Sequence, residues 1–326
     1  MKKVFKIIAV NLLVLCGLLL AAELFVAGIV VRKELLTEHY VMQLHSDEKV
    51  PDITITKYSK EYVKRVIDRH FVSKFNKYYE LRDFRTPAVG KSYKGDKDIV
   101  LAGCSYAYGT GIEQEETFGE ELARNLHDYK IYNAALEGGS PRETLYLLRN
   151  YKKCAEQGIF PENSANTKYF IYAFIGDQGR RLFLDIFRIS PVFKAYKDDN
   201  GVERLAYTEK RSIFDKSYIK FFFGYNYSPK LNDSMIKATT LYFSEMKRDV
   251  EKAFPNAKFI LFVYDDENYD YDWSILEKEG ITVLKLEEMS DIPIASDEKY
   301  LYKSHPNGLA WQIVVPILIK NLNMQK

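Results

Sequence analysis

A serine, a glycine and a histidine that are far apart in the sequence each lie where the chain leaves a predicted strand or enters a helix. Ser105 follows the apolar run 98–103, and a serine at the end of a buried strand presents its hydroxyl at the sheet edge, as a nucleophile must. His305 lies just before the last helical segment, from which its imidazole could reach Ser105 as general base. Gly138 lies in a further loop, 133–141, where the lack of a side chain lets a backbone N–H point into the same site.

Each of these residues also has an ordinary structural interpretation. Ser105 could cap a turn or a helix, and His305 could be a surface histidine. Gly138 and the following Gly139 serve a plain strand-to-helix turn equally well. The combination of the three positions, in this order along the chain, favours nucleophilic catalysis over three unrelated roles.

Alternating apolar runs and helical segments must position these residues. The runs predict buried strands at 98–103, 130–135, 168–175, 258–264 and 281–286. Helices are expected at 117–126, from Ser140 onward, around 233–254 and at 308–322, with capping pairs Thr117/Glu120 and Ser140/Glu143. Strand–helix alternation of this kind predicts a parallel sheet between helical layers, with ligands at the carboxyl ends of the strands.

The loop residues resemble the sequence blocks of the SGNH/GDSL hydrolase family over about residues 98–324. Block I resembles Gly103-Cys104-Ser105 with the following 106–109 and 115–118, block II resembles 133–138, block III falls on 175–179, and block V resembles His305-Pro306-Asn307. The resemblance implies an α/β fold, a flavodoxin-like three-layer α/β/α arrangement with a mainly parallel five-stranded sheet. It also implies an esterase reaction in which Ser105 attacks an ester carbonyl and His305 takes its proton.

The resemblance further implies an oxyanion hole made by the N–H groups of Ser105 and Gly138 and a block III side chain, Asp177 or Gln178. The family has an asparagine where this chain has Asp177, and an ionised carboxylate would repel an oxyanion. Either Asp177 is protonated, or Gln178 or a backbone N–H takes that place.

The acid that orients the histidine in this family lies two or three residues before it, where this chain has Tyr302 and Lys303. We expect Asp297, eight residues before His305, to take this role, because a loop of that length can fold back. Glu298 is the second choice, and a backbone carbonyl is the alternative to a carboxylate.

The first 34 residues predict a membrane anchor. The run 7–31 is interrupted only by Asn11 and Glu23, and as a helix it is long enough to cross a bilayer. Lysines precede it, which favours a cytoplasmic N-terminus and an extracytoplasmic catalytic domain at the cell membrane. A cleaved signal peptide is the alternative. Residues 35–97 predict a stalk and lead-in with a helix around 59–80, and 98–326 the α/β domain.

Composition narrows the possible partners. A net charge of +2 on 326 residues excludes a broad nucleic-acid-binding surface, and three distant cysteines predict neither a disulfide framework nor a metal site. No cofactor is expected. The aromatic-rich insertion 183–231 could form a lid over a glycan or an ordinary core patch.

From the motif resemblance and the apolar N-terminal run together, we expect a membrane-anchored serine esterase or acyl-transfer enzyme acting on O-acetyl groups of envelope polysaccharide. The alternative is a catalytically inactive carbohydrate-binding or scaffold protein on the same fold.

Overall fold

In the computed structural model the chain forms two units. One consists of Met1–Arg82, Leu184–Ser190 and Lys210–Pro229, and the other of Asp83–Phe183, Pro191–Glu209 and Lys230–Lys326. The structure describes residues 2–44, 84–182, 192–208, 219, 231–266, 269–302 and 304–324. The helix expected around 59–80 lies outside the described residues.

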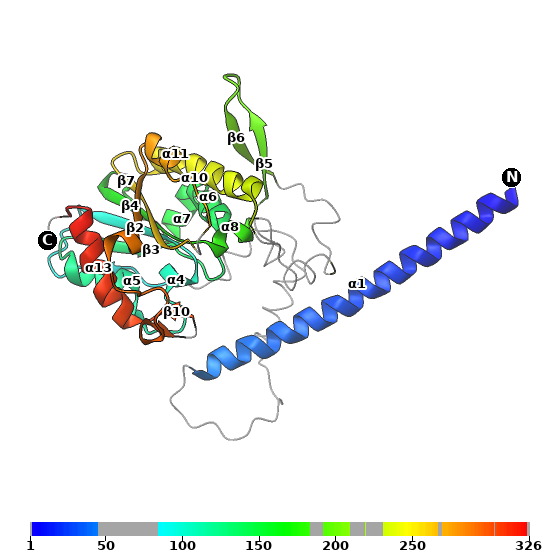
Figure 1. Cartoon of the computed structure of the whole chain (residues 1–326), viewed down its shortest axis with the longest axis horizontal. Helices are drawn as coiled ribbons and strands as arrows, with labels where there is room; N and C mark the ends of the chain where they lie inside the picture. The colour runs from blue at the N-terminus through cyan, green and yellow to red at the C-terminus, as the bar shows by residue number, and fades with distance from the viewer. Residues whose placement is uncertain are drawn as a thin grey trace. The chain divides into compact units, whose positions relative to one another are not determined.

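The first unit contains a long N-terminal helix, α1 (Lys2–Leu44) (Figure 1). Its segment Ile8–Ile29 has a mean hydropathy of 2.5, and 6% of its most apolar window is buried. A helix of this length and composition could span a membrane, as the sequence predicts for 7–31. A secretory signal sequence has the same properties, so the anchoring role remains a proposal.

The second unit is built on a six-stranded sheet in the order β1-β3-β2-β4-β7-β8. The strands are β1 (Ala88–Val89), β2 (Asp98–Gly103), β3 (Lys130–Asn133), β4 (Thr167–Ile175), β7 (Lys258–Asp265) and β8 (Thr282–Lys285). All five strands predicted from apolar runs are present and pair in parallel, in the flavodoxin-like order 2-1-3-4-5. The sixth strand, β1, pairs antiparallel with β3 at the sheet edge. Its two residues are too few to give a sequence signal.

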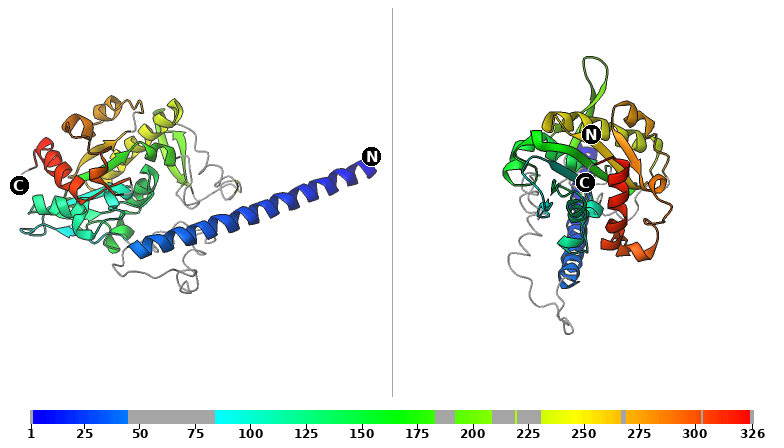
Figure 2. Two further views of the ribbon diagram at one scale, coloured as in Figure 1. Left: turned by 60° about the horizontal axis from the view of Figure 1, so that its bottom comes forward. Right: turned by 90° about the vertical axis from the view of Figure 1, so that its left-hand side faces the viewer.

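Helices cover both faces of this sheet, which gives the predicted three layers (Figures 1 and 2). The helices are α4 (Ser105–Tyr108), α5 (Phe118–Asn125), α6 (Pro141–Arg149), α7 (Tyr151–Glu156), α8 (Asp177–Arg181), α10 (Asp233–Ala253), α11 (Ser274–Lys278), α12 (Leu286–Met289) and α13 (Gly308–Asn321). Three short 3-10 helices are η1 (Gln114–Glu116), η2 (Ser164–Asn166) and η4 (Glu298–Tyr300).

Alternate residues of each strand face one helical layer or the other, because side chains in a strand point in turn to opposite faces. On one face, Phe118 of α5 stacks on Trp311 of α13 with ring centroids 4.4 Å apart. On the other face, Phe243 of α10 packs edge-on against Tyr172 and Phe174 of β4. These fully buried rings fix the helices to the sheet, so the loops at its carboxyl edge start from rigid positions.

Two of the helices begin with the caps that the sequence predicts. The Thr117 side chain accepts a hydrogen bond from the Glu120 amide, and α6 begins with a complete capping box between Ser140 and Glu143. Both caps satisfy amides of the first helical turn, which otherwise lack partners.

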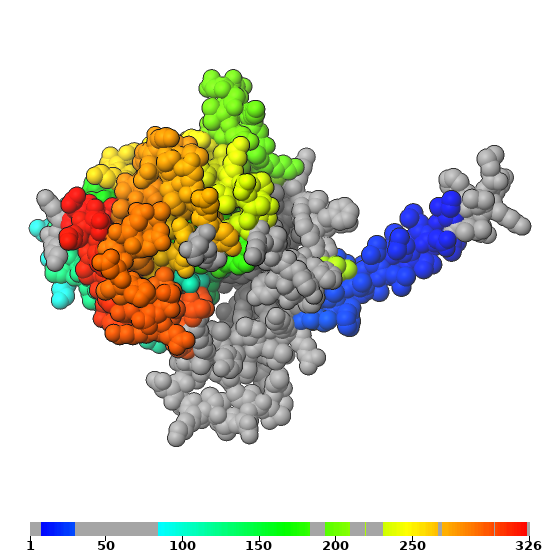
Figure 3. Space-filling view, in the orientation of Figure 1, coloured from blue at the N-terminus to red at the C-terminus, as the bar shows by residue number. Residues whose placement is uncertain are grey.

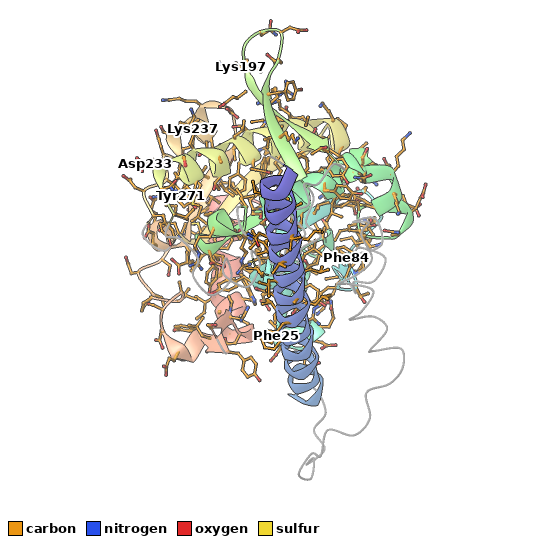
Figure 4. The ribbon with its side chains drawn as sticks, turned by 90° about the vertical axis from the view of Figure 1, so that its right-hand side faces the viewer. Phe25, Phe84, Lys197, Asp233, Lys237 and Tyr271 are labelled. Carbon is orange, nitrogen blue, oxygen red and sulfur yellow. The ribbon has the colours of Figure 1, made fainter. Side chains whose placement is uncertain are left out.

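The described part of the insertion 183–231 includes a β-hairpin that projects from the surface of this unit (Figures 1 and 3). It consists of β5 (Val192–Lys197) and β6 (Glu203–Thr208), paired antiparallel. At its base Phe193 packs against Tyr242 of α10, and Tyr207 packs against Tyr146 of α6. These aromatic contacts therefore attach the base of the hairpin to α6 and α10. Further out, Tyr196 is exposed, and Lys197 ends β5 (Figure 4).

A network of ion pairs also ties the hairpin to the two helices beneath it. The Glu245 carboxylate of α10 accepts hydrogen bonds from Arg149 of α6 at 2.8 Å and from Arg204 of β6 at 2.6 Å. Arg149 also donates to Asp249 at 2.6 Å and to the Leu205 carbonyl at 2.8 Å. Because the side chain of Glu245 is only 2% exposed, these pairs lie largely out of water.

Candidate active site

Ser105 lies at the carboxyl edge of the sheet because the chain turns sharply between β2 and α4. Gly103 has φ 142°, and a Cβ at this position would lie 2.6 Å from the Ala173 carbonyl oxygen of the neighbouring strand. Only glycine fits there without displacing backbone. Cys104 is the extended N-cap residue of α4, and Ser105 is its first helical residue. The glycine thus allows the serine to follow the strand directly.

The one-turn helix α4 is fastened at its end by Arg85, from the lead-in before β1. The guanidinium donates to the carbonyls of Tyr108 at 3.2 Å, Gly109 at 2.6 Å and Ile112 at 2.9 Å. It also lies 4.9 Å from the centre of the Tyr108 ring. A single helical turn is not stable alone, and a cation at its carbonyl end satisfies otherwise unpaired acceptors. Arg85 therefore helps to hold the turn that carries Ser105.

His305 contacts Ser105 from a small hairpin near the end of the chain. The hairpin pairs β9 (Leu301–Tyr302) with β10 (His305–Pro306), and His305 lies opposite Tyr302. His305 Nε2 lies 2.9 Å from Ser105 Oγ, a hydrogen-bond distance. Ser105 is 6% exposed and His305 is half-buried. The two residues that the sequence analysis paired as nucleophile and base are in contact.

The loop after β3 is held beside the nucleophile turn. The Leu136 amide donates to the Gly103 carbonyl at 3.1 Å, and Asn133 Nδ2 donates to the Ala107 carbonyl of α4 at 2.8 Å. Gly138 in this loop has φ 63°, which favours glycine. Within the described residues, the Gly138 amide donates to no other protein group. Its N–H is therefore available to a ligand.

Asp177 and Gln178, the expected block III donors, begin α8 after β4. The Asp177 carboxylate accepts hydrogen bonds from Arg181 Nε at 2.6 Å and from Arg180. A carboxylate paired with two guanidinium groups is an acceptor and has no proton to offer an oxyanion. Gln178 is fully buried, and its Oε1 accepts from the Ile175 amide at 3.2 Å. Of the two residues, Gln178 alone keeps a donor group, and that group is buried.

Asp297 is exposed and caps the 3-10 helix η4. Its carboxylate accepts a hydrogen bond from the Lys299 amide at 2.9 Å, its one hydrogen bond among the described residues. Glu298, the second choice, is also exposed. The hypothesis that Asp297 orients His305 directly therefore has no contact in its support. Asp297 lies in the turn that leads into the β9–β10 hairpin.

Sequence reasoning missed Tyr106 and Arg85. The Tyr106 hydroxyl donates to the Ser304 carbonyl at 2.7 Å, and its ring centroid lies 5.3 Å from that of His305. The position of Tyr106 directly after Ser105 was the only available signal, because its partners are about 200 residues away. Arg85 lies in a polar segment that carries no strand or helix pattern.

A groove of about 470 Å³ lies apart from these residues, along α10 and α11. Asp233 and Lys237 line it from α10, where Figure 4 labels them, and Asp272 and Ile275 also line it, Ile275 from α11. Among the residues that the structure describes, none that lines the groove belongs to the loops that carry Ser105, Gly138 or His305. Among the residues that the structure describes, no group of three or more histidines, cysteines or carboxylates could hold a metal ion.

No protein-family model and no curated protein matches the sequence. Among solved structures, the chain is similar to esterases and lipases of the GDSL/SGNH type, the resemblance expected from its motifs. Psychrotrophic esterase EstA from Pseudoalteromonas sp. is 14% identical with a TM-score of 0.41, over 70% of this chain and 97% of EstA. TesA is 12% identical with a TM-score of 0.39, over 69% and 98% of the two chains. Acetyl xylan esterase Est2A from Butyrivibrio proteoclasticus is 14% identical with a TM-score of 0.41, over 72% and 65%.

Proposed function

We propose that the chain is a serine esterase or acyl-transfer enzyme in which Ser105 is the nucleophile and His305 the general base. The observation that carries this proposal is the 2.9 Å contact between Ser105 Oγ and His305 Nε2 at the carboxyl edge of a parallel sheet.

In the proposed reaction, Ser105 Oγ attacks the carbonyl carbon of an ester while His305 Nε2 takes the serine proton. The oxyanion accepts hydrogen bonds from the backbone N–H groups of Ser105 and Gly138. Such fixed donors contribute about 3–4 kcal/mol each to lowering the barrier. The imidazolium then protonates the leaving alcohol, and an acyl-serine remains. Water or an acceptor hydroxyl, deprotonated by His305, releases the acyl group and restores the serine.

For Nε2 to accept the proton, the other ring nitrogen of His305 must carry hydrogen and donate it elsewhere. The Asp297 carboxylate is used as the cap of η4, so a backbone carbonyl is the proposed acceptor of this hydrogen bond. Replacing Asp297 by asparagine separates the two arrangements. With a carbonyl partner the rate stays close to that of the parent, whereas a carboxylate on the imidazole would make the change cost at least about a hundredfold in kcat.

We further propose that α1 anchors the protein in the cell membrane with its α/β domain outside the cytoplasm. The support is the apolar segment Ile8–Ile29 preceded by Lys2, Lys3 and Lys6. An extracytoplasmic site is compatible with acylated envelope polysaccharide as substrate, and the motif resemblance suggests O-acetyl esters. A reporter enzyme fused to the C-terminus should be active only outside the cytoplasm, and cytoplasmic activity would reject both the topology and this substrate.

A fluorophosphonate probe on the full-length protein in detergent tests the chemistry. We expect labelling at Ser105 that is lost in Ser105→Ala, reduced at least about a thousandfold in His305→Ala, and retained in Ser234→Ala, a control serine exposed on α10. Turnover of a small acetyl ester should follow the same order. A folded parent that is neither labelled nor active on several acyl esters would favour the alternative function, a carbohydrate-binding protein on this fold.

A further inference from the structure

Tyr106 connects the nucleophile turn to the hairpin that carries the histidine. Its hydroxyl donates to the Ser304 carbonyl at 2.7 Å, and its ring lies against the His305 ring with centroids 5.3 Å apart. On its other side it meets Tyr264 of β7 edge-on, with centroids 5.4 Å apart. Tyr106 is thus the residue after the proposed nucleophile and a direct neighbour of the proposed base.

The carbonyl that Tyr106 holds belongs to a residue with an unfavourable backbone conformation. Ser304 has φ 65°, one of two non-glycine residues with positive φ in the described part of the chain. A residue with a Cβ adopts this conformation only when its surroundings hold it there. The carbonyl of Ser304 belongs to the peptide bond that leads into His305. A hydrogen bond at this carbonyl therefore fixes the direction in which the His305 side chain leaves the backbone.

We propose that Tyr106 is a positioning residue for His305, an inference that rests on the proposed serine hydrolase function. Its hydroxyl keeps Ser304 in the left-handed conformation, and its ring limits the orientations open to the imidazole. Because Tyr106 directly follows Ser105 on α4, the same turn fixes both the nucleophile and, through the Ser304 carbonyl, the base. The hydroxyl donates to the Ser304 carbonyl, so it acts through His305 and not on the reacting atoms.

Tyr106→Phe tests this inference, because it removes the hydroxyl and keeps the ring. Losing one hydrogen bond should lower both kcat for a small acetyl ester and the rate of Ser105 labelling by about five- to tenfold. KM should stay within about twofold of the parent, since no substrate contact is removed. Tyr264→Phe is the matched control. It removes a hydroxyl from the ring that packs on Tyr106, and that hydroxyl has no partner among the described residues, so both rates should stay unchanged.

Ser304→Gly in the Tyr106→Phe background provides a rescue. Glycine adopts φ 65° without steric cost, so the hairpin should keep its conformation without the tyrosine bond, and kcat should recover to within about threefold of the parent. No recovery, a rise in KM at unchanged kcat, or a labelling rate equal to that of the parent would each overturn the positioning role. A parent that is not labelled at Ser105 would instead reject the proposed function, whatever the effect of the tyrosine.

Discussion

Replacing Glu245 by glutamine should loosen the β5–β6 hairpin from the domain and lower the free energy of unfolding. The Glu245 carboxylate accepts hydrogen bonds from Arg149 and Arg204 and also lies 3.4 Å from Arg248 Nε. Glutamine has nearly the same shape and keeps one oxygen acceptor. The substitution therefore removes the negative charge without opening a cavity, and leaves the guanidinium groups without that charge.

The expected decrease in the free energy of unfolding depends on how deeply the ion pairs of Glu245 are buried. Removing one partner of a fully buried ion pair costs about 3–5 kcal/mol. Here the side chains of Arg149 and Arg204 are each 24% exposed, and Arg149 keeps Asp249 as a partner, so water and the second carboxylate offset part of the loss. We expect a decrease of about 2–3 kcal/mol. For a domain of this size this corresponds to a Tm lower by about 5–10 °C.

Urea or thermal unfolding of the full-length variants in detergent measures this difference. Glu251→Gln is the matched control, because Glu251 lies on the same helix, pairs with Lys247 and is 58% exposed. A surface pair of this kind contributes less than about 1 kcal/mol. If the two glutamine variants unfolded at the same denaturant concentration, the conclusion that buried charge pairs attach the hairpin would be refuted.

Three further substitutions should change either the labelling rate of Ser105 or the stability of the fold. Arg85→Lys should slow fluorophosphonate labelling of Ser105 about tenfold, because lysine cannot bond to three carbonyls at once as the planar guanidinium does. An unchanged labelling rate would contradict the role of Arg85 in holding α4. Tyr264→Phe should raise the free energy of unfolding by about 1 kcal/mol in urea titrations, because its buried hydroxyl lacks a partner among the described residues, and a clear decrease would contradict this. Burial raises the pKa of the Asp98 carboxyl, so the folded state holds this proton more tightly and loses stability as the pH rises through the folded pKa. Asp98→Asn should therefore gain stability relative to the parent as the pH rises above about 4, the ordinary pKa of the carboxyl, and a difference that does not change with pH would reject the assignment.

The sequence predicted the parts of the fold that have a periodic apolar signal. The five parallel strands are short apolar runs, and burial on both faces explains why they carry no polar alternation, as in the fully buried β2. The two-residue strands β1, β9 and β10 have too few residues for any pattern. The single-turn helix α4 depends on a contact from Arg85, and nothing in the local sequence indicates that contact.

The candidate site was predictable where it depends on the ends of strands, and less so where it depends on side-chain partners. Ser105 and His305 follow from strand ends and loop positions, and the structure brings them together. Asp297 was chosen for its distance along the chain, but its hydrogen bond to Lys299 is a local cap of a kind common for aspartate. The pairing of Asp177 with arginines three and four residues later could have been predicted from helical spacing.

The sequence separation of 200 between Ser105 and His305 determines when the protein can first become active. The nucleophile turn is complete once β2, α4 and the strands beside them have formed, whereas its partner follows β8, the last strand of the sheet. During synthesis from the N-terminus, the proposed enzyme therefore carries an unactivated serine until nearly the whole domain has emerged. A chain that stops before residue 305 would retain the nucleophile turn and any membrane attachment but no base. Hydrolysis by this protein would accordingly report complete synthesis and folding of the α/β domain.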